Sequence, residues 1–209
     1  MHELLIELVK VLGSIVLGVI TGYYAIKLEI FKLKSNSKTQ PSKTDLLQNS
    51  IKLAQDIDAE LFSILSEIDC DRINIGTFSN GSKFYTGEPM QFVNQAFEKV
   101  KRGVSPISKD FRRVPISNFA YFYSQFRNTD VAQFNVTTVS DDTFREIMNY
   151  YDNKTIYGFI IYSSKNEWVG VLQLNWIGKE VTLTADEIAY IKMKCNIIGD
   201  MLENWSKYL

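Results

Sequence analysis

The side chains that most often perform catalysis or bind metals are scarce in this chain of 209 residues. Its single histidine is His2, and its two cysteines, Cys70 and Cys195, lie far apart without a CxxC pair. A histidine base, a His–Cys nucleophile and a zinc ribbon are therefore almost excluded. No carboxylate pair or nucleophile elbow replaces them. We expect no catalytic residue, no metal site and no cofactor, and we expect that the protein is not an enzyme.

The composition is that of a globular protein, with 45% apolar and 22% charged residues. The formal net charge is -1, which provides no whole-chain attraction to nucleic acid. Two cysteines without a disulfide framework suit a reducing compartment. The length allows one domain and an appendage.

An uncharged stretch near the N-terminus, VLGSIVLGVITGYYAI (11–26), precedes a series of lysines. With its apolar N-terminal flank it reaches the length of about 20 residues that a bilayer span requires. Tyr23 and Tyr24 end the stretch where aromatic rings favour the headgroup region. Five lysines follow it, against one before it: Lys27, Lys32, Lys34, Lys38 and Lys43. The positive-inside bias predicts a single-pass anchor in the inner, cytoplasmic membrane, with the C-terminal part in the cytoplasm.

Two other interpretations of this stretch stay open. A cleaved signal peptide needs a basic start, whereas this chain begins with Glu3 and Glu7. Apolar residues recur at helical spacing over residues 4–15, so a buried or coiled-coil helix also fits.

Two features of the stretch concern its neighbours in the membrane. Gly18 and Gly22 form a GxxxG pattern, which either lets two helices approach closely or reflects how common glycine is in such helices. The lysines from Lys27 onward either attract anionic lipid or only set the topology.

The chain divides at a polar linker that contains a proline. We assign residues 1–34 to the membrane helix and its basic flank, 35–44 to the linker and 45–209 to a single domain. Ser42 and Asp45 have the spacing of a capping box and predict the start of a helix. Apolar residues repeat along this helix with a period near 3.5. The stripe predicts packing in the core or a seam shared with a second copy, and the two are compatible.

The middle of the domain mixes strands and helices. Residues 72–78 alternate as a strand, Asn80-Gly81 is a hairpin-turn signal, and 82–86 would form the returning arm. From Pro89 to Gly103 the apolar residues follow a helical period, so we predict a helix there. Further helices are expected over 117–127 and 141–151, with a short strand over 133–139.

The last third has the clearest pattern. Residues 155–163 and 167–176 flank a short turn and predict an antiparallel hairpin. Its second arm is apolar on both faces, which predicts a central position in the sheet. Thr184 and Glu187 form a capping box before a long helix with a continuous apolar stripe. This order of elements predicts an α+β fold around an antiparallel sheet.

The chain resembles a GAF domain in three stretches. They are RRVPIS (112–117), DDTFREIMNYYDNKTIYGFIIYSSKNEWVGVLQLNW (141–176) and TLTADEIAYIKMKCNIIGDMLENW (182–205). The resemblance implies a central antiparallel sheet with the first and last helices packed on one face. It also implies a small-molecule pocket on the other face and a dimer formed by the two helices. PAS-like sensor folds share this layout.

The resemblance places candidate residues at both surfaces. At the pocket they are Arg113, Arg145, Tyr150, Tyr157 and Gln173. At the dimer helices they are Leu47, Ile57, Leu61, Ile191, Ile198 and Leu202. For Arg145, pairing with Asp141 or Asp142 on its own helix is the structural alternative, and the tyrosines could pack the sheet. Neither cysteine matches the position where family members attach a bilin.

Two functions follow as expectations. The first is a membrane-anchored, cytoplasmic, dimeric, non-enzymatic sensor or regulatory module whose ligand the sequence does not identify. Its partners would be membrane lipid and a second copy, but not nucleic acid. Because no output domain follows the last helix, signals would pass through partners or the membrane helix. The second is a bacterial or phage assembly scaffold at a membrane, whose domain binds a protein.

Overall fold

The computed structural model describes residues 23–24, 26–29, 42–83 and 89–206. The chain divides into two units, Met1–Leu46 and Leu47–Leu209. In the first unit, Tyr23, Tyr24 and residues 26–29 are helical and exposed, and the Lys27 ammonium lies 5.7 Å from the centre of the Tyr23 ring. No helix in the described ranges has the length and hydropathy that a bilayer crossing requires. Most of the predicted span, including Gly18 and Gly22, lies outside these ranges.

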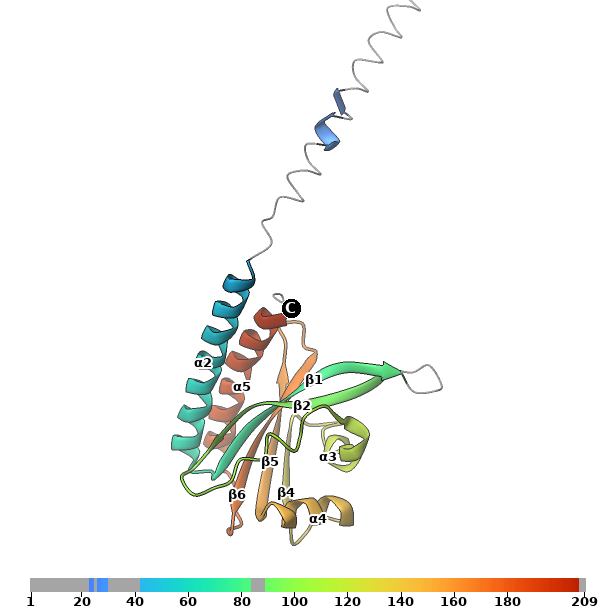
Figure 1. The fold of residues 1–209 in the computed structure, drawn as a ribbon. Coiled ribbons are helices and arrows are strands. Elements are labelled where there is room, and N and C mark those ends of the chain that lie inside the picture. The colour runs from blue at the N-terminus through green and yellow to red at the C-terminus, as the bar shows by residue number, and fades with distance from the viewer. Residues whose placement is uncertain (1–22, 25, 30–41, 84–88, 207–209) are drawn as a thin grey trace, which may run out of the picture. The chain divides into compact units, whose positions relative to one another are not determined.

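The second unit is built on a six-stranded antiparallel sheet with the strand order β3-β2-β1-β6-β5-β4. The strands are β1 (Arg72–Lys83), β2 (Pro89–Val100), β3 (Val114–Pro115), β4 (Val131–Asn135), β5 (Asn153–Tyr162) and β6 (Trp168–Ile177). The helices are α2 (Lys43–Ile68), the 3-10 helix η1 (Ile116–Phe119), α3 (Ala120–Ser124), α4 (Asp142–Tyr150) and α5 (Ala185–Ser206). Figure 1 shows α2 and α5 side by side on one face of the sheet, with α3 and α4 on the other.

Each face of the sheet carries its own core, because side chains alternate along the strands. Toward α2 and α5, Ile73 and Ile75 of β1 pack with Leu172 and Leu174 of β6. Toward α3 and α4, a second core contains Phe122, Phe126, Phe134, Phe144 and Met148. The aromatic stretch over 117–127 thus contributes largely to this second core; we call η1, α3 and α4 together the helical insert.

The sheet accommodates these rings at Gly158, which lies on β5 under α3. A Cβ there would lie 2.7 Å from Phe126 Cζ and 3.0 Å from Phe122 Cζ. Glycine therefore creates the space that the two rings occupy.

Several sequence predictions are confirmed. The capping box of α2 is formed, with Ser42 N donating to Asp45 Oδ2 over 3.1 Å. That of α5 is formed as well, with Thr184 N donating to Glu187 Oε2 over 2.7 Å. The 155–176 hairpin is present, and β6 lies between β1 and β5, as its two apolar faces predicted.

The helix predicted between Pro89 and Gly103 is wrong, because this segment forms β2. Ile75 pairs with Phe97 and Gly76 pairs with Gln95, which leaves Ala96 as a bulge. A bulge reverses the alternation of faces along a strand. The apolar residues on either side of it consequently follow a spacing that resembles a helical period.

The predicted Asn80-Gly81 turn is also wrong. Strand β1 continues through both residues, and Lys83 pairs with Pro89. Continuing the strand adds backbone pairs such as Ser79 with Phe92, which a turn at Asn80 would eliminate. The expected returning arm over 82–86 begins inside β1 and then leaves the described residues.

The residues proposed for the dimer helices are mostly interior. Ile57, Leu61, Ile191 and Ile198 are completely buried in the helix-side core, and Leu202 is nearly so. They pack α2 and α5 onto their own sheet. Leu47 alone of this set is exposed, at 61%.

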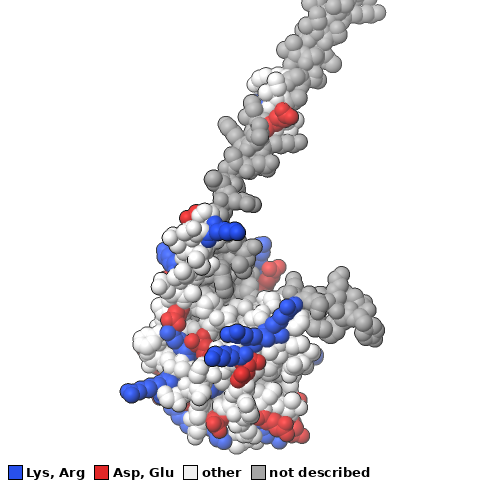
Figure 2. Space-filling model, in the orientation of Figure 1, with Lys and Arg blue, Asp and Glu red and all other residues white. Residues whose placement is uncertain are grey.

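Charged side chains of the second unit are interspersed in sign on the face that Figure 2 shows. Several of them pair across elements. Lys99 of β2 lies 2.6 Å from Asp58 of α2, and Lys194 of α5 lies 2.6 Å from Glu60. Partly exposed pairs of this kind contribute little stability individually.

Candidate functional site

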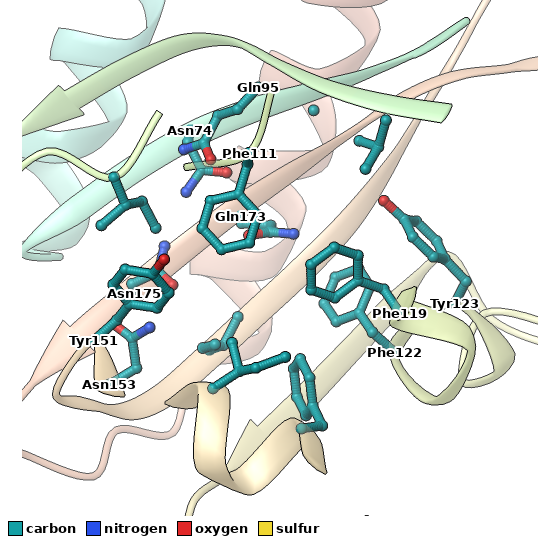
Figure 3. A pocket seen from close by; sticks show the side chains of 16 residues that line it. Asn74, Gln95, Phe111, Phe119, Phe122, Tyr123, Tyr151, Asn153, Gln173 and Asn175 are labelled. Atoms are coloured by element: carbon teal, nitrogen blue, oxygen red, sulfur yellow. The ribbon is translucent and has the colours of Figure 1, made fainter. Parts of the chain in front are cut away.

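A cavity lies between the sheet and the helical insert, on the face opposite α2 and α5. Its volume is about 50 Å³, and it is partly open to solvent. Figure 3 shows five carboxamides in its lining, from the four adjacent strands β2, β1, β6 and β5: Asn74, Gln95, Asn153, Gln173 and Asn175. Rings supply much of the remaining wall: Phe111, Phe119, Phe122, Tyr123 and Tyr151. The lining contains no Lys, Arg, His, Asp or Glu.

Strand alternation explains why the carboxamides gather here. Asn74 lies between Ile73 and Ile75, and Asn175 lies between Leu174 and Trp176, so each amide faces away from the helix-side core. The partner strands bring these residues together, since Asn74 pairs directly with Gln173 across β1 and β6. A row of amides in the centre of a sheet is an unusual use of positions that normally carry apolar side chains.

Two buried side-chain nitrogens, Arg72 Nε and Asn74 Nδ2, have no hydrogen-bond partner among the described residues, and of these two residues only Asn74 lines the cavity. Its side chain is 2% exposed, and its Nδ2 has no hydrogen-bond partner among the described residues. A buried amide left unpaired costs about 1–3 kcal/mol. Buried polar groups are usually satisfied. The Asn74 side chain lines the cavity, where a bound molecule could supply the missing partner.

Arg72 supports one end of the cavity by holding three segments together. Its Nη1 donates to Asn153 Oδ1 over 3.1 Å, and its Nη2 donates to the Ser105 carbonyl over 3.0 Å. Nε lies 3.8 Å from Glu98 Oε1. Burial lowers the pKa of Arg72, and the nearby Glu98 carboxylate opposes this shift. Nη1 and Nη2 are therefore committed to structure, whereas Nε, beside the Glu98 carboxylate, has no hydrogen-bond partner among the described residues.

The connection between β2 and β3 covers the cavity with Phe111. The centre of its ring lies 5.7 Å from that of Phe119 and 5.4 Å from that of Tyr151. The Tyr151 hydroxyl donates to Asp110 Oδ2 over 3.1 Å and so ties α4 to the same connection. Burial, with this hydrogen bond second, raises the pKa of Tyr151 to about 12. The hydroxyl consequently stays protonated, and able to donate, throughout the physiological range.

One of the five predicted pocket residues, Gln173, lines this cavity. Arg145 instead forms a 2.9 Å ion pair with Asp142 and donates to the Val139 carbonyl, as the structural alternative predicted. Tyr157 points into the opposite core, where its hydroxyl accepts from Leu183 N over 3.1 Å.

The remaining two predicted residues also lie outside the cavity. Tyr150 is 79% exposed on α4, while its neighbour Tyr151 reaches the cavity. Arg113 has a left-handed backbone, with φ of 51°, and its guanidinium lies over the Phe92 ring at 5.2 Å. The prediction placed charged and exposed side chains where the structure has neutral amides.

Sequence reasoning missed four of the five carboxamides. Asn175 interrupts the arm that is apolar on both faces, at a position that should be buried, and this was the available signal. Asn74 falls on the polar face of its alternating strand and Asn153 is the first residue of β5, so neither gave such a signal. Gln95 could not be found in this way, because its strand was predicted as a helix.

Neither cysteine belongs to the site. Both thiols are buried, and burial raises the pKa of Cys70 to about 12 and that of Cys195 further still. Both are consequently poor nucleophiles. Across the ranges that the structure describes, no group of three or more metal-binding side chains is arranged to hold an ion.

The comparisons with known proteins match the fold and not the sequence. No family model matches the chain, and no curated protein does. A GAF domain from Synechocystis sp. PCC6803 in its photoproduct state has a TM-score of 0.53 at 16% identity, over 73% of this chain and 94% of its own. The GAF domain of a two-component sensor histidine kinase from Bacillus halodurans has a TM-score of 0.52 at 17% identity, over 72% and 96%.

A third match is a GAF domain/HD domain protein from Geobacter sulfurreducens, with a TM-score of 0.55 at 10% identity over 74% of this chain and 94% of that one. Identities this low establish the fold alone. The chain therefore has a GAF-like α+β fold, with a six-stranded antiparallel sheet between a helix pair and a helical insert.

Proposed function

We propose that this protein is a membrane-anchored sensor or regulatory module that binds a small molecule in the cavity of its GAF-like domain. The observation that supports this best is Asn74, a buried amide donor without a partner that faces the cavity. A domain built only for stability would gain by placing an apolar residue there. The solved neighbours include a GAF domain in a photoproduct state and the GAF domain of a two-component sensor histidine kinase, which supports a sensing role as a use of this fold.

The proposed anchor is the uncharged stretch 11–26, followed by the lysines that begin at Lys27. The domain would face the cytoplasm, in keeping with its two free thiols. No catalytic group lines the cavity, so we propose a binding role without chemistry. Fractionation of cells that produce the full chain tests the anchor: extraction from membranes should require detergent, and release by salt or alkali would refute it.

We further propose that the protein is a dimer in which the exposed side of α2 contacts a second copy. Leu47, Ile51 and Phe62 are 61%, 50% and 62% exposed, and they fall within one stripe of the helix. The contact would thus use Leu47 with other exposed residues of α2, and not the buried members of the set that the sequence pointed to.

The sensing proposal is tested by thermal unfolding of the full chain against a panel of nucleotides and metabolites. A true ligand at about 100 times its Kd adds about 2.7 kcal/mol, or roughly 5–10 °C in Tm for a chain of this size. Gln173→Phe should fill the cavity and abolish the shift. Gln133→Phe, on the exposed surface of the edge strand β4, is the matched control and should preserve it.

A second function, an assembly scaffold that binds a protein, is favoured by the small size of the cavity. Its volume of about 50 Å³ is a third of the roughly 150 Å³ of an engineered cavity that holds benzene. A panel without any stabilising compound, together with large stable oligomers of the full chain, would support the scaffold and refute the sensor.

A further inference from the structure

We propose that the cavity selects a small, uncharged molecule with an amide-like N–C=O edge. This inference rests on the sensing function proposed above and specifies the chemical class of its ligand. Four properties of the cavity support the inference: its charge, its hydrogen-bonding groups, its shape and its size.

The charge of the lining excludes ions. No Lys, Arg, His, Asp or Glu is among the lining residues. Arg72, which bonds to the lining residue Asn153, is paired with Glu98, and Glu98 also accepts from the backbone N–H groups of Ile107 and Ser108 at 2.9 and 3.0 Å. A carboxylate or ammonium that entered would lose its hydration without gaining a counter-charge. A neutral molecule avoids this cost.

The hydrogen-bonding groups favour an amide. A carboxamide side chain carries two N–H donors and one carbonyl acceptor, so it pairs best with a molecule that offers both functions. The N–H of Asn74 lacks an acceptor, and Gln173 is its direct cross-strand neighbour on the same face. An N–C=O edge could accept from Asn74 with its oxygen and donate to the carbonyl of Gln173 with its nitrogen.

The walls and the volume restrict shape and size. The rings of Phe111, Phe119 and Tyr151 form an apolar wall opposite the amides, which favours a flat molecule with an apolar side. About 50 Å³ holds only a few heavy atoms while Phe111 remains in place. The cavity as it stands matches a molecule of the size of acetamide and not a nucleotide.

Acetamide and acetate give a matched pair of probes, because they have nearly the same shape and differ in charge. Saturation-transfer NMR on the full chain should detect acetamide at millimolar concentration, and acetate should bind at least about tenfold more weakly. Asn74→Leu and Gln173→Leu should each weaken acetamide binding about tenfold, since each removes one hydrogen bond to it. Asn196→Leu, on the exposed side of α5, removes an amide elsewhere and should have no effect.

The outcomes separate this inference from the proposed function. Equal binding of acetate would refute the selection for neutral molecules. Acetamide binding that neither cavity variant weakens would place the molecule elsewhere and refute the site. If acetamide fails to bind while another compound stabilises the chain and Gln173→Phe abolishes its effect, the ligand class is wrong and the sensor stands. If no compound binds, both proposals fall.

Discussion

Asn74 and Asn153 offer a direct test of whether the cavity holds an unsatisfied polar group. The two asparagines line the same cavity and are almost equally buried, at 2% and 3% exposure. They differ in their partners: Asn74 Nδ2 has none, whereas Asn153 Oδ1 accepts from Arg72 Nη1. Replacing each by leucine, which has nearly the same size and shape, should therefore change stability in opposite directions.

For Asn74→Leu we expect a gain. The substitution removes a desolvated amide that costs about 1–3 kcal/mol, without stranding a protein partner. A net gain of about 1–2 kcal/mol in the free energy of unfolding corresponds to about 2–8 °C in Tm for a chain of this size. For Asn153→Leu we expect a loss of about 1.5–3 kcal/mol, because a hydrogen bond to a charged group is lost and Arg72 Nη1 is left unpaired.

The assay is thermal unfolding of both full-length variants beside the wild type without added ligand, supported by urea titration to confirm the free energies. Asn74→Leu should also lose ligand binding, so that greater stability accompanies lost function. If Asn74→Leu destabilises the protein as much as Asn153→Leu does, then Asn74 has a partner in the free protein. The reasoning about the cavity would in that case be refuted.

Three further predictions concern other parts of the domain. Gly199→Ala should destabilise the protein by several kcal/mol, because the new Cβ would lie 2.1 Å from the Tyr162 carbonyl oxygen. This loss should exceed the gain from alanine's better helix propensity. Denaturant titration measures it, and an unchanged midpoint would contradict this packing. Phe62→Asp, at an exposed position of α2, should convert the proposed dimer to a monomer in analytical ultracentrifugation and lower the free energy of unfolding by no more than about 1 kcal/mol. The pKa of Asp69 is lowered by hydrogen bonds from two lysines, first from Lys101 and then from Lys179. The stabilisation by ionised Asp69 should therefore be complete above the ordinary carboxyl pKa and be lost as the pH falls through the lowered pKa. The stability difference between wild type and Asp69→Asn should accordingly vanish in strong acid, and a difference that persists at the lowest pH would assign it to another cause.

The pattern of the sequence was sufficient where a single local rule operates. The capping residues Thr184 and Glu187 fix the start of α5 because the interaction is made within one helical turn. The hairpin arm with apolar residues on both faces forms β6, which lies in the centre of the sheet. A central strand is buried on both faces and therefore needs apolar side chains on both. Both features depend only on residues that are close together in the sequence, so they can be predicted without knowing the fold.

The pattern was misleading where distant segments decide the outcome. The bulge at Ala96 reverses the faces of β2, and its position depends on the pairing with β1. Tyr150 and Tyr151 are adjacent residues of the same type, and the sequence gives no reason to prefer one. Only Tyr151 reaches the cavity, where it contacts Phe111 and Asp110 from the β2–β3 connection. Arg145 was a reasonable ligand-binding candidate until the helix start placed Asp142 and the Val139 carbonyl within its reach.

The sequence by itself determined the class of the fold, the principal helices, the central hairpin and the scarcity of catalytic side chains, because these follow from local periodicity, capping and composition. Only the tertiary structure decided where the cavity lies and what lines it. Asn74, Gln173 and Asn175 become one polar surface through the register of β1 and β6, and Asn153 joins them from β5. A pairing register is a property of two strands at once, which is why no single stretch of the chain could reveal this site.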